Sequence, residues 1–336
     1  DFVNRSACLP SHEGEIDPSK TYDISYDIIS SKVVHNIDFK NYDNTSSDSI
    51  YPLDNIYISD PQVMRDLVLN QIGFIPYKYS SQQKSLEVYE KVQINIIEMG
   101  NSNIDYFIPQ KKSRVFAEIY QNSIINHEFS DRDEDYQIPS ILYICGGNAC
   151  NNSYFLNLVD WRRKQGYYVT VASTSDIGSG ESSINNYISS AYLNDEHPPE
   201  IVGLVGDVGG SYNISCDSYN WAGYSGASDV IYSYVEGNDL LPEIIIGRIS
   251  ANGTSELYNI INKTIKYEKA QVQTDLNWFE SAGLVGDPTT SGFSCAITNQ
   301  YINQLMQNHG LEDVNLDIDG GGGQLDQFVI DEFNRH

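Results

Sequence analysis

The most constraining feature of this sequence is a short apolar run that ends in a glycine turn. The segment 200–210, EIVGLVGDVGG, places four aliphatic side chains before Gly206 and Asp207. A run this short and rich in branched residues is typical of a strand buried on both faces. Similar runs occur at 141–147 and 281–287, with helical periodicity in between. Strands that alternate with helices predict a mainly parallel sheet.

The ends of these strands predict where chemistry takes place. In parallel α/β sheets, ligands bind outside the carboxyl ends of the strands. Asp207 and Asp287 each follow a glycine at such an end. We therefore expect functional groups along this edge of the sheet. For Asp287 the alternative is a structural turn residue before Pro288, because Asp side chains often stabilise turns.

The length and the patterns along the chain predict two domains. At 336 residues the chain is too long for one ordinary domain. Residues 1–110 alternate apolar and polar side chains, for example at 86–97, and predict an antiparallel β-sandwich. Residues 111–137 have the composition of an exposed connector, and residues 138–336 have that of an α/β domain. Its last helical pattern stops where a further strand is expected, so we interpret this domain as incomplete.

The charge balance argues against several classes of partner. The chain has 46 acidic and 20 basic residues, which gives a net charge of −26. Such a surface repels the phosphates of nucleic acids and suits salty or calcium-containing surroundings. No apolar run reaches the length of about 18 residues that a membrane-spanning helix needs. Five cysteines, an odd number without a C-x-x-C pair, predict no disulfide framework.

Carboxylates form the only local clusters with a chemical interpretation. The sequence contains no nucleophile elbow, no G-x-G-x-x-G, no P-loop lysine and no H-E-x-x-H. Glu236, Asp239 and Glu243 are close enough to wrap a hard cation such as calcium, although a polar loop before a strand explains the same pattern. Residues 315–320 resemble the beginning of a calcium loop, but their apolar alternation favours a strand that leads into a glycine-rich turn.

Several segments, taken in order, resemble the gingipain-like cysteine peptidases of peptidase family C25. The segments similar to the catalytic domain are LVGD at 204–207, Ser228–Asp229, GND at 237–239, EIIIGR at 243–248, TIKYE at 264–268 and DEFN at 331–334, together with Trp161. Residues 58–65 and 76–79 are similar to the β-sandwich pro-region of the same family. The resemblance covers most of the chain.

This resemblance implies a caspase-like α/β domain that cleaves peptide bonds with a Cys/His dyad. It also implies a secreted or cell-surface precursor that binds calcium and acts on protein or peptide substrates. By position, Asp287 matches the acid that orients the dyad histidine. Asp239 and Glu243 match a calcium-binding loop, and Asp229 is a further candidate ligand.

The dyad itself matches no residue of this chain. The family's histidine follows a strand expected after residue 336, and neither His336 nor Cys145, Cys150, Cys216 or Cys295 fits the family's motifs. We therefore interpret the chain as a pro-region plus the first part of a catalytic domain, with the dyad beyond residue 336 and no activity of its own. The alternative is a non-catalytic secreted surface or adhesion protein with a degenerate α/β domain.

Two further expectations concern specificity and processing. The segment 291–298 carries no acid that could pair with a basic substrate residue, so the preferred substrate side chain stays open. Lys111, Lys112 and Arg114 form a basic patch in the expected connector, and exposed segments of this kind are sites of proteolytic cleavage. In a third hypothesis, the β domain covers the active edge as an inhibitory pro-region until the chain is cut there.

Overall fold

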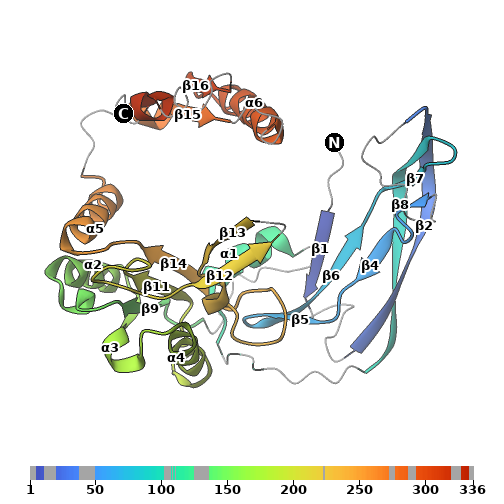
Figure 1. The fold of residues 1–336 in the computed structure, drawn as a ribbon. Coiled ribbons are helices and arrows are strands. Elements are labelled where there is room, and N and C mark those ends of the chain that lie inside the picture. Colours follow the sequence, from blue (N-terminus) through green and yellow to red (C-terminus); the bar gives the residue numbers. More distant parts are fainter. Residues whose placement is uncertain are drawn as a thin grey trace. The chain divides into compact units, whose positions relative to one another are not determined.

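The chain divides into two compact units, Asp1–Lys263 and Thr264–His336 (Figure 1). The computed structural model describes residues 5–10, 20–37, 50–101, 107, 109, 111–124, 136–221, 224–271, 277–286, 293–318 and 327–332. The first unit contains the expected β region together with a four-stranded parallel sheet. The domain boundaries proposed at 110 and 138 stay predictions.

Two antiparallel sheets form the N-terminal part of the first unit. One contains β1 (Arg5–Pro10), β6 (Leu67–Phe74) and β4 (Ile56–Ile58), with β5 (Gln62–Met64) also paired to β6. The other has the order β2 (Lys20–His35), β8 (Ser85–Asn101), β7 (Tyr77–Ser80) and β3 (Ile50–Tyr51). Apolar side chains join the sheets: the ring of Tyr26 lies 5.2 Å from that of Phe74, and Ile72 packs with Tyr22 and Ile24. The strand predicted at 86–97 lies within β8.

The predicted parallel sheet is confirmed in the second half of this unit. Its strands are β9 (Ser140–Cys145), β10 (Tyr168–Ser173), β11 (Ile201–Val205) and β14 (Ile245–Ile249), in the order β10-β9-β11-β14. All three pairings are parallel. Every residue of β9 is buried, as expected for an interior strand without an exposed face. The carboxyl ends of β9 and β11 therefore lie next to each other.

Helices pack on both faces of the parallel sheet. The helical segments of this part are α2 (Ser153–Lys164), α3 (Thr174–Ile177), α4 (Glu181–Asn194) and the beginning of α5 (Thr254–Glu268), whose last residues belong to the second unit, with short 3-10 helices η1 (Ala149–Asn151) and η2 (Val230–Ser233). Leu142 and Ile144 join Ile188 of α4 in one buried cluster. Tyr143, between them on β9, contacts Phe155 of α2 with ring centroids 5.4 Å apart. Because alternate strand residues point to opposite faces, α2 and α4 cover opposite sides. Residues Asp217–Trp221 (β12) and Tyr224–Ser228 (β13) form an antiparallel hairpin.

The stretch expected as an exposed connector contains a packed helix. Helix α1 spans Arg114–Ser123, and the hydroxyl of Ser113 accepts a hydrogen bond from Phe116 N at its first turn. Phe116 and Tyr120 are buried against Leu69 of β6. The basic residues Lys111, Lys112 and Arg114 at the start of this stretch are themselves exposed, as expected.

The second unit contains a smaller parallel pair of strands. The 3-10 helix η3 (Asn277–Glu280) leads into strand β15 (Ser281–Val285). This strand pairs in parallel with β16 (Asp313–Asp317), and helix α6 (Phe293–Asn308) lies between the two strands in the chain. Residues 327–332 are also helical. Asn299 of α6 donates a hydrogen bond to the carbonyl of Val285 at 2.7 Å, which ties the helix to the end of β15. The strand predicted at 281–287 is thus confirmed where the structure describes it.

Candidate functional site at the edges of the parallel sheet

Asp207 lies at the carboxyl edge of the parallel sheet, two residues after β11. Its carboxylate accepts hydrogen bonds from the hydroxyl of Ser250 at 2.7 Å, from Asn252 Nδ2 at 3.0 Å and from Val208 N at 2.8 Å. The Ser250 hydroxyl, followed by the Val208 amide, lowers the pKa of Asp207 below its usual value. Asp207 is therefore an ionised carboxylate that joins the loops after β11 and β14.

Glycines allow the loops at this edge to pack closely. A side chain at Gly146 or Gly206 would collide with the carbonyl oxygen of Tyr212. Gly147 has φ +53°, and a side chain there would collide with the carbonyl of Ser211. Only glycine tolerates both this conformation and this approach. The turn after β9 and the loop 209–214 after β11 therefore rest on each other.

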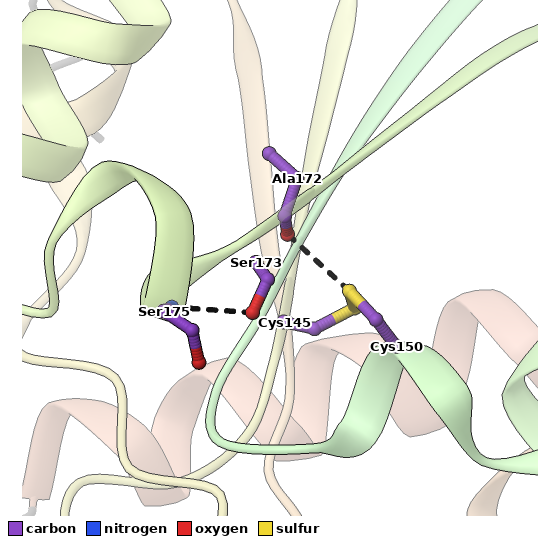
Figure 2. The surroundings of a disulfide bond; sticks show 5 residues. All are labelled: Cys145, Cys150, Ala172, Ser173 and Ser175. Carbon is purple, nitrogen blue, oxygen red and sulfur yellow. Dashed lines mark hydrogen bonds between the residues drawn. A yellow bond between two sulfur atoms is a disulfide. The ribbon is translucent and has the colours of Figure 1, made fainter.

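A disulfide bond joins Cys145 and Cys150 at this edge (Figure 2). The expectation that the cysteines form no disulfide framework is thus wrong for this pair. Cys216 and Cys295 are free thiols, half-buried and exposed respectively. The side chain of the fifth cysteine, Cys8, lies outside the described residues.

Asp229, predicted as a calcium ligand, forms a salt bridge with Arg248 at the end of β14. Its two carboxylate oxygens accept hydrogen bonds from Arg248 Nε at 2.8 Å and from Nη2 at 2.6 Å. The same guanidinium also donates to the carbonyls of Gly206, Ile214 and Ser215 at 3.1–3.3 Å. Arg248 thereby fixes the loops that follow β11. The structure brings Asp229 to this guanidinium, whereas Asp239 and Glu243 belong to a different loop.

Glu243 and Asp239 lie at the amino edge of the sheet, in the loop that precedes β14. Glu243 is fully buried. Its Oε2 accepts hydrogen bonds from Val235 N at 2.8 Å and Glu236 N at 3.2 Å. Its Oε1 accepts none from any described residue. Burial, with the nearby charge of Asp239 as a smaller cause, raises the pKa of Glu243 to about 7.

Asp239 connects this loop to the N-terminal β region. Its Oδ2 accepts a hydrogen bond from Val63 N in β5 at 2.8 Å, and its Oδ1 accepts one from Leu241 N at 2.8 Å. Asp239 and Glu243 thus supply carboxylate oxygens, the kind of ligand that a hard cation prefers. One of these atoms, Glu243 Oε1, is buried and has no described hydrogen-bond donor. Among the described residues, no group of three or more His, Cys, Asp or Glu side chains could hold a metal ion.

Arg65 is a buried cation at the same edge that the sequence patterns did not reveal. It occupies the turn between β5 and β6 with φ +53°, and its side chain is fully buried. Its Nη1 donates to the carbonyls of Pro199 and Glu243, both at 3.0 Å, and Nη2 donates to that of Pro198 at 3.2 Å. The guanidinium also lies over the rings of two aromatic residues, at 5.4 Å in each case. Arg65 therefore anchors the β region to the amino edge of the sheet.

Glu200, just before β11, is a further buried side chain there. Its Oε1 accepts a hydrogen bond from the hydroxyl of Ser113, and its Oε2 accepts one from Ser140 N at 2.8 Å. The link from Ser113 ties the first turn of α1 to the sheet. No sequence motif marks Arg65 or Glu200, because a charged residue in a turn or before a strand usually faces water.

The remaining predicted site residues are only partly described. Asp287 lies outside the described residues. Lys111, Lys112 and Arg114 are exposed, and the Arg114 guanidinium stacks on the Tyr136 ring at 4.5 Å. In the described part of the chain, none of the helices has the length and apolar character needed to cross a membrane.

Comparisons with known proteins match both halves of the chain. The family model described as "Peptidase family C25" matches residues 134–320, and the model of the propeptide of this family matches residues 6–133. Gingipain R2 of Porphyromonas gingivalis is 24% identical over 301 residues, which cover 86% of this chain and 39% of the relative. Lys-gingipain of the same organism is 25% identical over 266 residues, which cover 75% of this chain and 15% of the relative.

The solved structure "Complex of Porphyromonas gingivalis RgpB pro- and mature domains" is similar over 57% of this chain and 45% of that chain, with 24% identity and a TM-score of 0.47. The chain spans about two fifths of the length of gingipain R2.

Proposed function

Because the chain belongs to peptidase family C25, we propose that it is part of the precursor of a secreted cysteine endopeptidase. The observation that carries this proposal is the order of the two family matches, a propeptide followed by the peptidase. The predicted caspase-like topology of the α/β part and the β-sandwich arrangement of the N-terminal part belong to the same proposal. The substrates are proteins or peptides, which is the substrate class of a peptidase.

In this proposal the reaction follows the general chemistry of cysteine peptidases. A thiolate attacks the scissile carbonyl, an imidazolium protonates the leaving amine, and a carboxylate orients the imidazole. We assign the orienting role to Asp287, which follows β15. The nucleophilic cysteine and its histidine lie beyond residue 336, so this chain by itself is expected to be inactive. The disulfide excludes Cys145 and Cys150 as the nucleophile, because disulfide-bonded sulfur cannot attack the carbonyl.

Secretion is supported by the same disulfide and by the charge of the chain. Disulfides persist in oxidising compartments such as the extracellular space. A net charge of −26 suits surroundings rich in salt or calcium. We therefore propose that the protein is secreted or held at the cell surface.

We propose a structural calcium ion at the loop that holds Asp239 and Glu243. The buried Oε1 of Glu243, which has no described donor, supports this assignment. A calcium ion there would neutralise the ionised Glu243 carboxylate. Without an ion, burial raises the pKa of Glu243 to about 7. Asp229 supports the site less well, because its oxygens already accept hydrogen bonds from Arg248.

The contacts of the N-terminal region support anchoring at the amino edge. Arg65 and the amide of Val63 both contact the segments that precede the strands of the parallel sheet. The hypothesis that this region covers the carboxyl edge finds no support among these contacts. Cleavage at Lys111, Lys112 or Arg114 stays a proposal. The buried Ser113 between them indicates that a protease must first open the start of α1.

The test is peptidase activity of a gene product that extends past residue 336. We expect hydrolysis of casein that is abolished by iodoacetamide and reduced by Asp287→Asn. The matched control, Asp176→Asn, changes an exposed carboxylate in α3 and should leave the activity intact. A longer product without alkylation-sensitive hydrolysis would overturn the proposal.

The second candidate function is a non-catalytic surface or adhesion protein. The disulfide favours it, because it removes Cys145 and Cys150 from the cysteines that could act as a nucleophile. The coding sequence after residue 336 distinguishes the two. A histidine after the next strand and a later cysteine support the peptidase, and their absence supports the binding protein.

A further inference from the structure

The disulfide closes a tight turn between an interior strand and the first helical turn after it. Cys145 is the last residue of β9 and is fully buried, whereas Cys150 lies in η1 and is half-buried. Only residues 146–149 separate the two cysteines. The bond therefore holds η1 against the end of a strand that has neighbours on both sides.

The turn inside this disulfide supports the neighbouring loop. Gly146 N donates a hydrogen bond to the carbonyl of Val205 at 3.0 Å, at the end of β11. Gly146 and Gly147 contact the backbone of the loop 209–214 so closely that neither position has room for a side chain. The amide of Ile214 in turn donates to the carbonyl of Asp207 at 2.9 Å. A displacement of residues 146–149 would therefore also displace the loop 209–214 and, through Ile214, the backbone of Asp207.

The surroundings of Cys150 suit both oxidation states. Its sulfur lies 3.4 Å from the carbonyl oxygen of Ala172 in β10, as Figure 2 shows. A disulfide sulfur carries no proton, so in the oxidised protein this contact is not a hydrogen bond. After reduction the Cys150 thiol has a proton to donate, and the Ala172 carbonyl is positioned to accept it.

From these contacts we propose that the Cys145–Cys150 disulfide is a redox-sensitive clip that holds the carboxyl-edge loops together. A dithiol reductant opens it by attack of one thiolate on the sulfur of Cys150, the less buried of the two cysteines. The S–S bond breaks, and Cys145 leaves as a thiolate that takes up a proton. The second thiol of the reductant then resolves the mixed disulfide and releases Cys150, so that two electrons pass to the protein and the reductant becomes a disulfide.

The amino edge provides an internal reference, because it is held without sulfur. Glu200 and Arg65 fix it through hydrogen bonds to Ser113, Ser140 and backbone carbonyls. Reduction should leave these contacts unchanged. The clip therefore predicts a local response at one edge of the sheet. This inference does not rest on the proposed peptidase activity.

The experiment is hydrogen exchange of the oxidised protein and of the protein reduced with dithiothreitol, read by mass spectrometry of its peptides. We expect exchange in residues 146–152 and 207–214 to rise about tenfold or more on reduction, because a cross-link that closes a short loop suppresses opening by at least that factor. Peptides from β6 and α1 should not change. Alkylation of both thiols confirms that reduction is complete.

Two variants separate the clip from other effects of the reductant. The chain with Cys145→Ala and Cys150→Ala should show the fast exchange with and without dithiothreitol. The chain with Cys216→Ala and Cys295→Ala keeps the disulfide and should respond like the wild type. Equal exchange in the oxidised and fully reduced wild type would overturn the proposal, and so would alkylation of both Cys145 and Cys150 without any reductant.

Discussion

Replacing Glu243 by glutamine should remove a large part of the pH dependence of folding. Glu243 is fully buried, and burial raises its pKa from 4.5 to about 7. The folded protein therefore holds this proton more tightly than the unfolded chain does. The stabilising contribution of the protonated group is complete below about pH 4.5 and is lost as the pH rises through about 7.

The size of this contribution follows from the shift itself. Each pH unit of difference between the folded and unfolded pKa corresponds to about 1.4 kcal/mol, so the whole effect is about 3 kcal/mol. The glutamine carbonyl can still accept the hydrogen bonds from Val235 N and Glu236 N. Its amide does not ionise, so the variant lacks the pH-dependent part. Any cost of the new amide group at the place of Oε1 is independent of pH.

The assay is urea unfolding in the presence of a chelator at a series of pH values. The free energy of unfolding of the wild type minus that of Glu243→Gln should fall by about 3 kcal/mol between about pH 4.5 and about pH 8. Other titrating groups contribute equally to both proteins and cancel. Glu236→Gln, a change of another carboxylate in the same loop, is the matched control. A difference that stays flat over this range would refute the burial argument.

Adding calcium extends the same experiment to the proposed metal site. At about pH 8, calcium should restore stability to the wild type, because it binds the ionised carboxylate of the folded state, and the free energy of unfolding then rises with the logarithm of the calcium concentration. Glu243→Gln should gain much less. An equal gain in both proteins would place the calcium elsewhere, even if the pH result held.

Three further substitutions test the contacts at the two edges of the sheet. Arg65→Ala should lower the free energy of unfolding by about 3 kcal/mol, since it removes the guanidinium donor from the buried carbonyls of Pro199 and Glu243 and one of three donors from that of Pro198; urea titration measures this. Arg248→Lys should cost about 2 kcal/mol, because lysine cannot form the paired hydrogen bonds to Asp229; a melt with an unchanged midpoint would contradict this. Ser113→Ala should cost about 3 kcal/mol, since both the helix cap and a hydrogen bond to buried Glu200 are lost; thermal unfolding beside Ser123→Ala at the far end of α1 checks it.

The parallel sheet was predictable because short runs of consecutive apolar residues mark its interior strands in the sequence. Strands β9 and β11 are nearly continuous apolar runs, and such a run has a stable place only between two covered faces. The segments 141–147 and 200–210 lie at the predicted places, and their strands are neighbours in the sheet.

Helix α1 was missed because it is short and begins in a basic stretch that is typical of an exposed connector. Phe116, Ala117 and Tyr120 are buried, and Val115 and Ile119 also pack against the core. Whether such a short amphipathic stretch is a helix or a connector depends on the surface available to it. Here β6 and the segment before β14 provide that surface.

The sequence alone determined where the strands of the parallel sheet lie and that the chain resembles peptidase family C25, because apolar periodicity and ordered motifs are properties of consecutive residues. Only the tertiary structure decided what the polar residues do. Asp207 is half-buried and ionised, Asp229 is bound to Arg248, and Glu243 is buried with a pKa raised to about 7. The charge of a carboxylate depends on its burial and on hydrogen-bond donors from segments distant in the sequence. Two cysteines five residues apart form a disulfide only where the fold turns the chain between them.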